Sequence, residues 1–312
     1  MTEQWNPDRS TLVVDAPAAL TQTEIDQRVL DLYDEYCHGR IDRREFLQRA
    51  SVLTIGGVSA LAMAQALLPR YALAQTISFT DQRIKAKYVT YPSPGGTSGT
   101  MRGYLVQPNG QGPFPVVLVI HENRGLNPYI EDVARRAATE GFLALAPDGL
   151  WPVGGYPGND DDGRTLQAGL DQGKLRTDMV NSARFLKAHA LSAGKLGVTG
   201  FCWGGSTTNF LAVTLGADLK AGVPFYGAAA ETTRVPDIKA PLLIQYAETD
   251  ERINALWPAY EAALKASNVQ YEMHMYPGTQ HGFHNNSTPR YHEASAKLAW
   301  ERTIAFFKKH LA

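Results

Sequence analysis

The chain has 312 residues, 44% of them hydrophobic, which is enough for one large α/β domain with additional N-terminal material. Its net charge of −1 argues against a nucleic acid as its main partner, and its two cysteines are too few for a disulfide framework. No GxGxxG, P-loop or HExxH pattern occurs, and the histidines and cysteines are too scattered for a zinc site. We therefore expect no cofactor and no metal.

Residues 1–74 are predicted to form a leader that precedes a folded domain of residues 75–312. Within the leader, residues 21–36 have the pattern of an amphipathic acidic helix. The one cysteine of this part, Cys37, is expected to have no structural partner if the other cysteine has to be a free thiol.

The leader also contains the features of an export signal. The segment Asp42–Gln48 resembles a twin-arginine motif because it carries the adjacent pair Arg43-Arg44. An uncharged, moderately apolar stretch follows over residues 50–68, and Ala72-Leu73-Ala74 supplies an A-x-A cleavage pattern before Gln75. These features predict export by the twin-arginine translocation machinery and a periplasmic or secreted mature protein. The alternative is a cytoplasmic protein whose retained leader packs on the domain or on a second subunit.

Beyond residue 80, the sequence predicts two antiparallel strands followed by alternating strands and helices. This alternation indicates an α/β fold, with a mostly parallel sheet, right-handed crossovers and helices on both faces. Ligand chemistry then belongs at the carboxyl ends of the strands. The expected strands are 83–91, 101–107, 116–120, 142–146, 195–198, 221–225, 242–246 and 271–275, and the expected helices are 129–140, 175–190, 255–266 and 291–311, with a further helix after Cys202.

The most informative segment is Val198-Thr199-Gly200-Phe201-Cys202-Trp203-Gly204-Gly205, an apolar strand that runs into a G-x-C-x-G turn. This pattern predicts a nucleophile elbow with cysteine in place of serine. Side chains at Gly200 and Gly204 would collide with the neighbouring strand and helix, and the nucleophile itself would have strained backbone. The alternative is that Cys202 is a small buried hydrophobic residue, as most free cysteines are.

An acid and a histidine follow the elbow in the order that this architecture requires. Asp250 is the preferred acid, because it lies in the polar loop after the apolar strand 242–246. Glu248 and Glu251 are competing acids in the same loop, and all three are otherwise solvated loop charges.

His281 is the preferred base, since it ends the loop 277–283 after a predicted strand. His274, His284 and His292 compete with it, but His274 lies inside the strand and the other two follow the turn at Gly282. A lone loop histidine is usually solvated, so the predicted triad depends on chain order and strand-end position together.

The end of the strand 116–120 is the predicted oxyanion site. Residues 114–120 form a continuous apolar run, as expected for a central strand that is covered on both faces. In this fold the oxyanion hole uses backbone N–H groups after such a strand and after the nucleophile, so we assign it to Asn123 and Trp203. Glu122 lies beside them and is a candidate catalytic carboxylate; the alternative is an ordinary strand-end charge.

The connection between Asp148 and Gly173 is rich in glycine, proline and aspartate. Polar connections of this length are often lids or mobile loops. We expect Trp151, Tyr156 and Arg164 to contact substrate from this loop, the alternative being that each is solvated.

Four segments together resemble the dienelactone hydrolase (carboxymethylenebutenolidase) family of α/β-hydrolases, over roughly residues 80–312. They are His121-Glu122-Asn123-Arg124-Gly125, Gly200-Phe201-Cys202-Trp203-Gly204-Gly205, Glu248-Thr249-Asp250 and Gln280-His281-Gly282-Phe283. The resemblance implies a Cys202-His281-Asp250 triad with esterase or lactonase chemistry. It also implies that Glu122 lies beside the resting thiol and moves when substrate binds.

The same resemblance suggests where substrate is held. Arg124 and Phe283 belong to the matching segments and are predicted to bind substrate. In the family, arginines from the lid-like loop and from the loop after the histidine hold a substrate carboxylate; Arg164 fills the first role, but the nearest arginine after His281 is Arg290. This departure leaves the dienelactone substrate itself open.

The expected function is therefore hydrolysis of a small-molecule ester or lactone through a thioacyl intermediate. A thiol has a pKa of about 8.5, which a neighbouring imidazolium lowers, whereas a nearby Glu122 carboxylate opposes thiolate formation. The alternatives are a broad carboxylesterase and, from another class, a binding or redox-sensing module that uses Cys202. The sequence leaves a homo-oligomer open.

Overall fold

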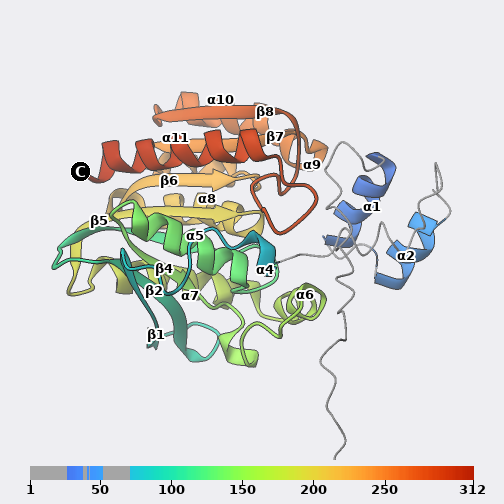
Figure 1. Ribbon diagram of the computed structural model, residues 1–312. Helices are drawn as coiled ribbons and strands as arrows, with labels where there is room; N and C mark the ends of the chain where they lie inside the picture. Colours follow the sequence, from blue (N-terminus) through green and yellow to red (C-terminus); the bar gives the residue numbers. More distant parts are fainter. Residues whose placement is uncertain (1–26, 38–40, 42, 52–70) are drawn as a thin grey trace, which may run out of the picture.

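The computed structural model describes residues 27–37, 41, 43–51 and 71–312. An eight-stranded sheet in the order β1-β2-β4-β3-β5-β6-β7-β8 forms its centre (Figure 1). β1 and β2 pair with each other, and β2 with β4, in antiparallel fashion, and the remaining pairs are parallel. The strands are β1 Ile84–Ser93, β2 Gly99–Pro108, β3 Phe114–Ile120, β4 Leu143–Pro147, β5 Ser192–Phe201, β6 Leu219–Phe225, β7 Leu242–Thr249 and β8 Tyr271–Gln280.

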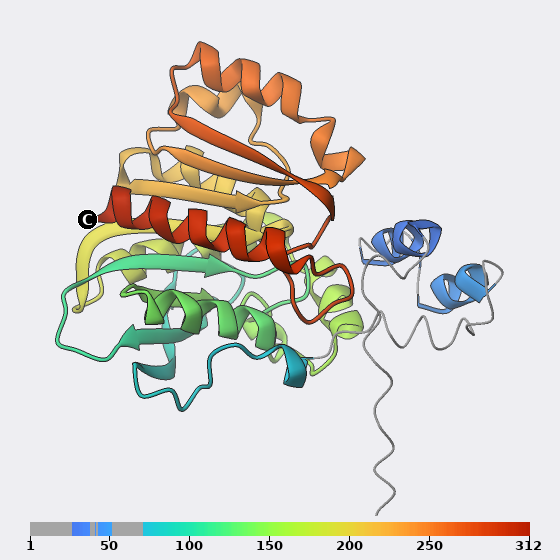
Figure 2. The ribbon, with the colours of Figure 1, turned by 45° about the horizontal axis from the view of Figure 1, so that its top comes forward.

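Helices cover both faces of the sheet, which confirms the expected α/β-hydrolase architecture (Figure 2). α5 and α11 pack on one face, and α7, α8 and α10 on the other. The helices of this part are α5 Pro128–Thr139, α6 Asp160–Ala168, α7 Gln172–Lys187, α8 Trp203–Leu215, α9 Glu251–Asn254, α10 Trp257–Ala266 and α11 Glu293–Leu311, and the short 3-10 turns are Trp151–Val153, Gly216–Asp218 and Thr232–Asp237.

The central strand β3 explains why its sequence is apolar without interruption. Successive side chains of a strand point to opposite faces, so a strand covered on both sides buries all of them. Val117 and Val119 pack with α5 and α11, whereas Val116, Leu118 and Ile120 pack with α7 and α8. The carboxyl end of β3 is thereby fixed in the middle of the sheet.

Two expectations about the elements need correction. The connection 148–173 is not an unstructured loop, because residues 160–168 form α6. The side chain of Asn159 accepts a hydrogen bond from the Asp162 N–H at 2.9 Å, and the three aspartates that follow lie in the first turn, where the helix dipole favours negative charge. β8 also runs beyond Met275 to Gln280, so the loop before His281 is shorter than predicted.

Part of the predicted leader packs on the domain. The helices of this part are α1 Gln27–Cys37, α2 Arg43–Ser51 and α4 Tyr71–Ala74. α1 and α2 share a small apolar cluster of their own that includes Tyr33, Tyr36 and Phe46. α4 contacts α5, and the backbone N–H groups of Thr76 and Ile77 donate to Asp132 at 3.0 and 2.8 Å. The boundary at residue 75 stays a prediction, and the stretch 52–68 of the export signal lies outside the described residues.

Candidate active site

Cys202 lies in a strained turn between β5 and α8. Its φ of 56° is in the left-handed region, which costs free energy for a residue other than glycine. A Cβ atom on Gly200 would lie 2.3 Å from the carbonyl oxygen of Gly204, and one on Gly204 would lie 2.4 Å from that of Ile120. The two glycines therefore allow the strand, the turn and the helix to approach this closely, as the sequence analysis argued.

His281 lies directly after β8 and joins Asp250 to Cys202. The Nδ1 atom of His281 is 2.6 Å from the Asp250 Oδ2 atom, and Cys202 lies close enough to the ring to act on its pKa. Burial on its own would lower the pKa of His281, but the neighbouring Asp250 and Cys202 outweigh it, so the pKa lies well above that of a free imidazole. An imidazolium is thus favoured beside the thiol.

The competing acids and histidines lie elsewhere. Glu248 is exposed and accepts a hydrogen bond from the Gly278 N–H at 2.7 Å, and Glu251 is exposed in the first turn of α9. His274 lies on β8, and His292 is the N-terminal cap of α11. His284 lies in the core, where its Nδ1 atom shares a hydrogen bond of 2.7 Å with the Tyr129 hydroxyl. Among the candidates that the sequence analysis weighed, Asp250 is the acid that contacts His281.

Glu122 is a buried carboxyl group close to the thiol. It is 4% exposed, and its Oε2 atom accepts a hydrogen bond from the Asn285 side chain at 2.9 Å. Burial raises the pKa of Glu122 above its usual value; Arg124 opposes this, whereas the proximity of Cys202 adds to it. A negative charge on Glu122 and one on Cys202 therefore disfavour each other.

The predicted oxyanion donors lie on two segments that touch. Trp203 is the first residue of α8, where backbone N–H groups have no acceptor within the helix. Asn123 follows the end of β3, and the start of α8 lies against that end, since a Cβ on Gly204 would be 2.6 Å from the carbonyl oxygen of His121. Asn123 and Trp203 are far apart in the chain, but the structure thus brings the segments that carry them close together in space.

Arg124 and Tyr156 belong to a buried polar cluster around Asp160, which is the first residue of α6. Arg124 forms an ion pair with the Asp160 Oδ2 atom at 2.6 Å, and both side chains are almost completely buried. The Oδ1 atom of Asp160 accepts hydrogen bonds from the hydroxyl groups of Tyr71 and Tyr156 at 2.5 and 2.8 Å. These contacts connect α4, α6 and the segment after β3, and they give Arg124 and Tyr156 a structural role in this conformation.

The remaining predicted substrate contacts are dispersed. The guanidinium group of Arg102 lies over the ring of Trp151, 4.8 Å from the centroid of that ring. Arg164 lies 4.2 Å from the ring centroid of Tyr36 and donates to the backbone carbonyl of that residue.

Phe283 is a correction to the predicted site. It has no exposed surface and packs against Tyr276, with ring centroids 5.0 Å apart, and against Tyr226 at 5.6 Å. The turn at Gly282, whose φ is 88°, directs the chain back into the molecule directly after His281. Phe283 therefore supports the site from the core and presents no surface to a substrate.

Sequence reasoning missed three residues near the triad. The ring of Tyr226 lies 5.0 Å from that of His281, His121 stacks on Trp203, and Asn285 bonds Glu122. Tyr226 and His121 each follow a parallel strand directly, so the rule that ligand chemistry lies at the carboxyl ends of strands was a usable signal for both. No local pattern pointed to Asn285.

Residues 101–311 match the family model described as the Dienelactone hydrolase family. The chain belongs to this family. A second model, described as YqhI-like, matches residues 17–55, which include α1 and α2.

Individual relatives of the dienelactone hydrolase family agree with this assignment. An Escherichia coli K12 protein called a hydrolase fragment, YghX, is 62% identical over 115 residues, which are 36% of this chain and 97% of that protein. A provisionally named carboxymethylenebutenolidase of the same organism is 34% identical over 76% of this chain and 92% of its own length. The crystal structure of a provisionally named dienelactone hydrolase from Klebsiella pneumoniae is similar with a TM-score of 0.63 and 30% identity, over 72% of this chain and 99% of that one.

As a dienelactone hydrolase family member, the chain is a hydrolase of ester or lactone bonds, and the predicted family and fold are confirmed. Among the described residues, no group of three histidine, cysteine or acidic side chains is placed to hold a metal ion. In the same part of the chain, no helix combines the length and the apolar character needed to cross a bilayer.

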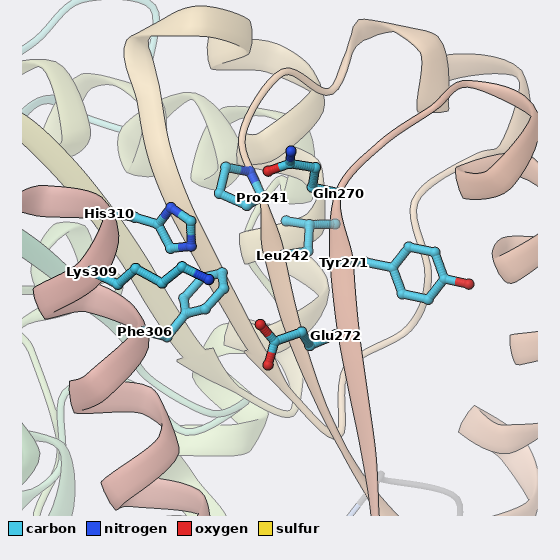
Figure 3. A pocket seen from close by; sticks show the side chains of 8 residues that line it. All are labelled: Pro241, Leu242, Gln270, Tyr271, Glu272, Phe306, Lys309 and His310. Atoms are coloured by element: carbon cyan, nitrogen blue, oxygen red, sulfur yellow. The ribbon is translucent and has the colours of Figure 1, made fainter.

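A separate hollow of about 270 Å³ lies at the other end of the sheet (Figure 3). Its lining includes the first residues of β7 and β8, Leu242 and Tyr271, and the last turn of α11. Asp250 and His281 follow the opposite ends of the same two strands, so this hollow is not part of the dienelactone hydrolase site.

Proposed function

We propose that the protein hydrolyses carboxylic esters or lactones by nucleophilic catalysis, with Cys202 as nucleophile, His281 as proton shuttle and Asp250 as the group that orients His281. The observation that carries this proposal is the position of the His281 imidazole, which is 2.6 Å from the Asp250 carboxylate and close enough to Cys202, at a strained elbow, for Cys202 to raise the pKa of the ring. Nucleophile, base and orienting acid in hydrogen-bond reach are the signature of an activated nucleophile.

The proposed reaction has two halves. In the first, the Cys202 thiolate forms a bond to the carbonyl carbon, the ester C–O bond breaks, and the His281 imidazolium gives its proton to the leaving alkoxide. In the second, His281 takes a proton from water, the resulting hydroxide attacks the thioester, and the C–S bond breaks to release the carboxylic acid. The Asn123 and Trp203 N–H groups stabilise the oxyanion that forms in each half.

The Asp250 carboxylate holds His281 by its Nδ1 atom, at 2.6 Å. That contact leaves the Nε2 side of the ring for exchange of the proton with sulfur, alkoxide and water. Because Asp250 and Cys202 raise the pKa of His281, they favour a thiolate–imidazolium pair, and attack by a thiolate formed in this way needs no concerted proton removal.

Glu122 is proposed to restrain this pair in the free enzyme. Its carboxylate is buried close to Cys202, so two adjacent negative charges raise each other's free energy. A substrate that displaces the carboxylate or takes the charge of the sulfur into a covalent bond relieves this repulsion. The site is therefore suited to reactive esters and lactones.

The substrate class extends beyond dienelactones in this proposal. Arg164, which takes the place of one clamp arginine, and Arg290, the nearest arginine after His281, both lie against aromatic rings of α1, at 4.2 and 5.0 Å from the centroids of Tyr36 and Tyr33. A neutral acyl substrate does not require either arginine to leave its ring.

The test is turnover of a p-nitrophenyl ester and of a cis-dienelactone by the full chain and by Cys202→Ala. The wild type is expected to hydrolyse at least the activated ester, and the variant is expected to lose several orders of magnitude in rate with its fold intact. Near-normal turnover in Cys202→Ala would rule out the proposed nucleophile. Absence of turnover of both substrates by the wild type would favour a binding or redox-sensing module.

A further inference from the structure

We propose that His121 is a positioning residue that fixes the direction of the Asn123 N–H and the placement of Trp203, and so assembles the oxyanion hole. The inference rests on the proposed function, because it needs an oxyanion to stabilise. It starts from three contacts of one fully buried ring: with the Glu122 carbonyl, with the Gly149 N–H and with the indole of Trp203.

The contacts of the ring determine its tautomer. A backbone N–H is only a donor, so the Gly149 N–H, at 3.2 Å, donates to Nε2, which must lack a proton. Nδ1 therefore carries the proton of the neutral ring and donates it to the Glu122 carbonyl oxygen at 2.6 Å. Burial lowers the pKa of His121, which keeps the ring in this neutral form.

The acceptor of that hydrogen bond belongs to the peptide group that carries the proposed oxyanion donor. The Glu122 C=O and the Asn123 N–H share one planar peptide unit, and in a trans peptide they point in opposite directions. A donor that holds the carbonyl oxygen therefore also fixes the direction of the N–H. Preorganised direction is what gives an oxyanion hole its effect, because no reorientation is then needed during the reaction.

The same ring contacts the residue of the second proposed donor. The imidazole of His121 and the indole of Trp203 are stacked, with centroids 5.3 Å apart and planes at 13° to each other. Trp203 is the first residue of α8, so this stack connects the end of β3 to the N-terminus of the nucleophile helix. One side chain thus contacts both residues whose N–H groups are proposed to bind the oxyanion.

Gly149 confines the ring from the other side. A Cβ atom on Gly149 would lie 2.5 Å from Nε2 of His121, closer than side chains approach, so a glycine is required for this fit. The imidazole of His121 has no exposed surface, and each of its two nitrogens takes part in a hydrogen bond. It therefore has no alternative orientation that keeps these contacts. This packing gives a way to disturb His121 without replacing it.

The primary test compares His121→Phe with His121→Asn in the full chain. Phenylalanine keeps a ring against Trp203 but has no donor, whereas asparagine places an N–H donor at the position of Nδ1. We expect kcat for a p-nitrophenyl ester to fall about 10- to 100-fold in His121→Phe with KM little changed, and to recover largely in His121→Asn. The affinity for a trifluoromethyl ketone, whose adduct carries an oxyanion, should rank the two variants in the same order as kcat/KM does.

A second test uses Gly149→Ala, with Gly169→Ala as its matched control. The new methyl group at position 149 should displace the ring and lower kcat with KM preserved. Gly169 lies in the same connection before α7, and a Cβ there would meet its nearest atom at an ordinary 3.5 Å, so the control should keep wild-type kcat.

The outcomes separate this inference from the proposed function. If iodoacetamide alkylates Cys202 of the wild type without loss of turnover, the proposed nucleophile fails, whatever the His121 variants do. If alkylation abolishes turnover but His121→Phe keeps wild-type kcat and ketone affinity, the positioning role of His121 is wrong. Equal losses in the Phe and Asn variants, together with a lower melting temperature, would also overturn it in favour of a purely structural role.

Discussion

At the scale of single residues, the position of His281 between Asp250 and Cys202 determines how the proposed chemistry depends on pH. The raised pKa of His281 means that the folded chain binds a proton more tightly at this ring than the unfolded chain does. The ion pair therefore stabilises the fold fully at pH values below the ordinary pKa of histidine, and this contribution is lost as the pH rises through the raised folded-state pKa.

Replacing Asp250 by asparagine should shift the alkaline limb of the activity profile. Asp250→Asn removes the charge that helps to hold the proton on His281, so the pKa of the ring falls toward its ordinary value. We expect kcat/KM of the variant to begin its alkaline decline at a lower pH than that of the wild type, and kcat to be lower at every pH. The measurement is a pH–rate profile of both proteins with a p-nitrophenyl ester, with Glu248→Gln as the control because Glu248 is an exposed neighbour near the end of β7. An unchanged alkaline limb in Asp250→Asn would exclude the assigned role.

Glu122 gives a second prediction at this scale. In Glu122→Gln the buried charge beside Cys202 is gone, so the thiol should react faster with iodoacetamide near neutral pH. Turnover of an ester should nevertheless fall if the carboxylate helps to activate the thiol once substrate binds. Alkylation rates measured against pH for both proteins, alongside turnover, check this. Identical alkylation profiles would place Glu122 outside the catalytic machinery.

The sequence was informative about which residues lie at the strand ends and less so about where their side chains point. Cys202, Asp250 and His281 follow parallel strands in the chain order of this fold, and parallel strands bring their carboxyl ends to one edge. Phe283 and Arg124 lie beside predicted site residues in the chain, yet one points into the core and the other bonds Asp160. A turn such as that at Gly282 determines which way the next side chain points. The geometry of such a turn depends on packing against residues that are far away in the sequence.

At the scale of secondary structure elements, α6 is the main difference between expectation and structure. The glycine, proline and aspartate content of the connection 148–173 indicated a loop, but the Asn159 cap and the acidic first turn are equally the start of a helix. The helix is held to the domain by Asp160, which bonds Arg124, Tyr71 and Tyr156. That network joins three segments far apart in sequence, so local pattern gave no sign of it.

Removing the Asp160 carboxylate should destabilise this region strongly. Asp160→Ala leaves the nearly buried Arg124 without the ion pair, and breaking such a pair costs about 3–5 kcal/mol. Asp162 is the matched control, because it lies in the same first turn but is exposed, and Asp162→Ala should change the free energy of unfolding by less than about 1 kcal/mol. Urea unfolding of both variants measures the difference. Equal stability of the two would show that the Asp160 cluster contributes little.

At the scale of the whole molecule, the N-terminal part lies against the catalytic domain at the end where the site is. In both views α1 lies beside the loop that connects β8 to α11, and Arg290 of that loop is 5.0 Å from the ring centroid of Tyr33 (Figures 1 and 2). α4 is held by the bond from Tyr71 to Asp160 and by the Asn286 side chain, which donates to the Ala74 carbonyl at 2.7 Å. The sequence predicted a separable leader, with a retained leader packed on the domain as the alternative, and its local pattern does not encode the tertiary contacts that such packing uses.

Export is the prediction that belongs to this scale. We propose that a host with a working twin-arginine pathway releases mature protein that begins near Gln75, and that replacing Arg43 and Arg44 by lysine retains the precursor in the cytoplasm. Cell fractionation with N-terminal sequencing is the measurement. The Tyr71 contact with Asp160 is lost on cleavage, so the mature protein should also unfold at a lower urea concentration than the precursor. Recovery of only uncut cytoplasmic protein from the native cell would contradict export.

The most direct test of the central claim is to trap the acyl group on the enzyme. The full chain is mixed with a p-nitrophenyl ester, quenched in acid within the first turnovers and digested for mass spectrometry. The account predicts one acyl group on the peptide that contains Cys202, its decay at the rate of turnover, and its absence in Cys202→Ala. An acyl group on a different residue, or turnover of the ester by Cys202→Ala at the wild-type rate, would contradict the account.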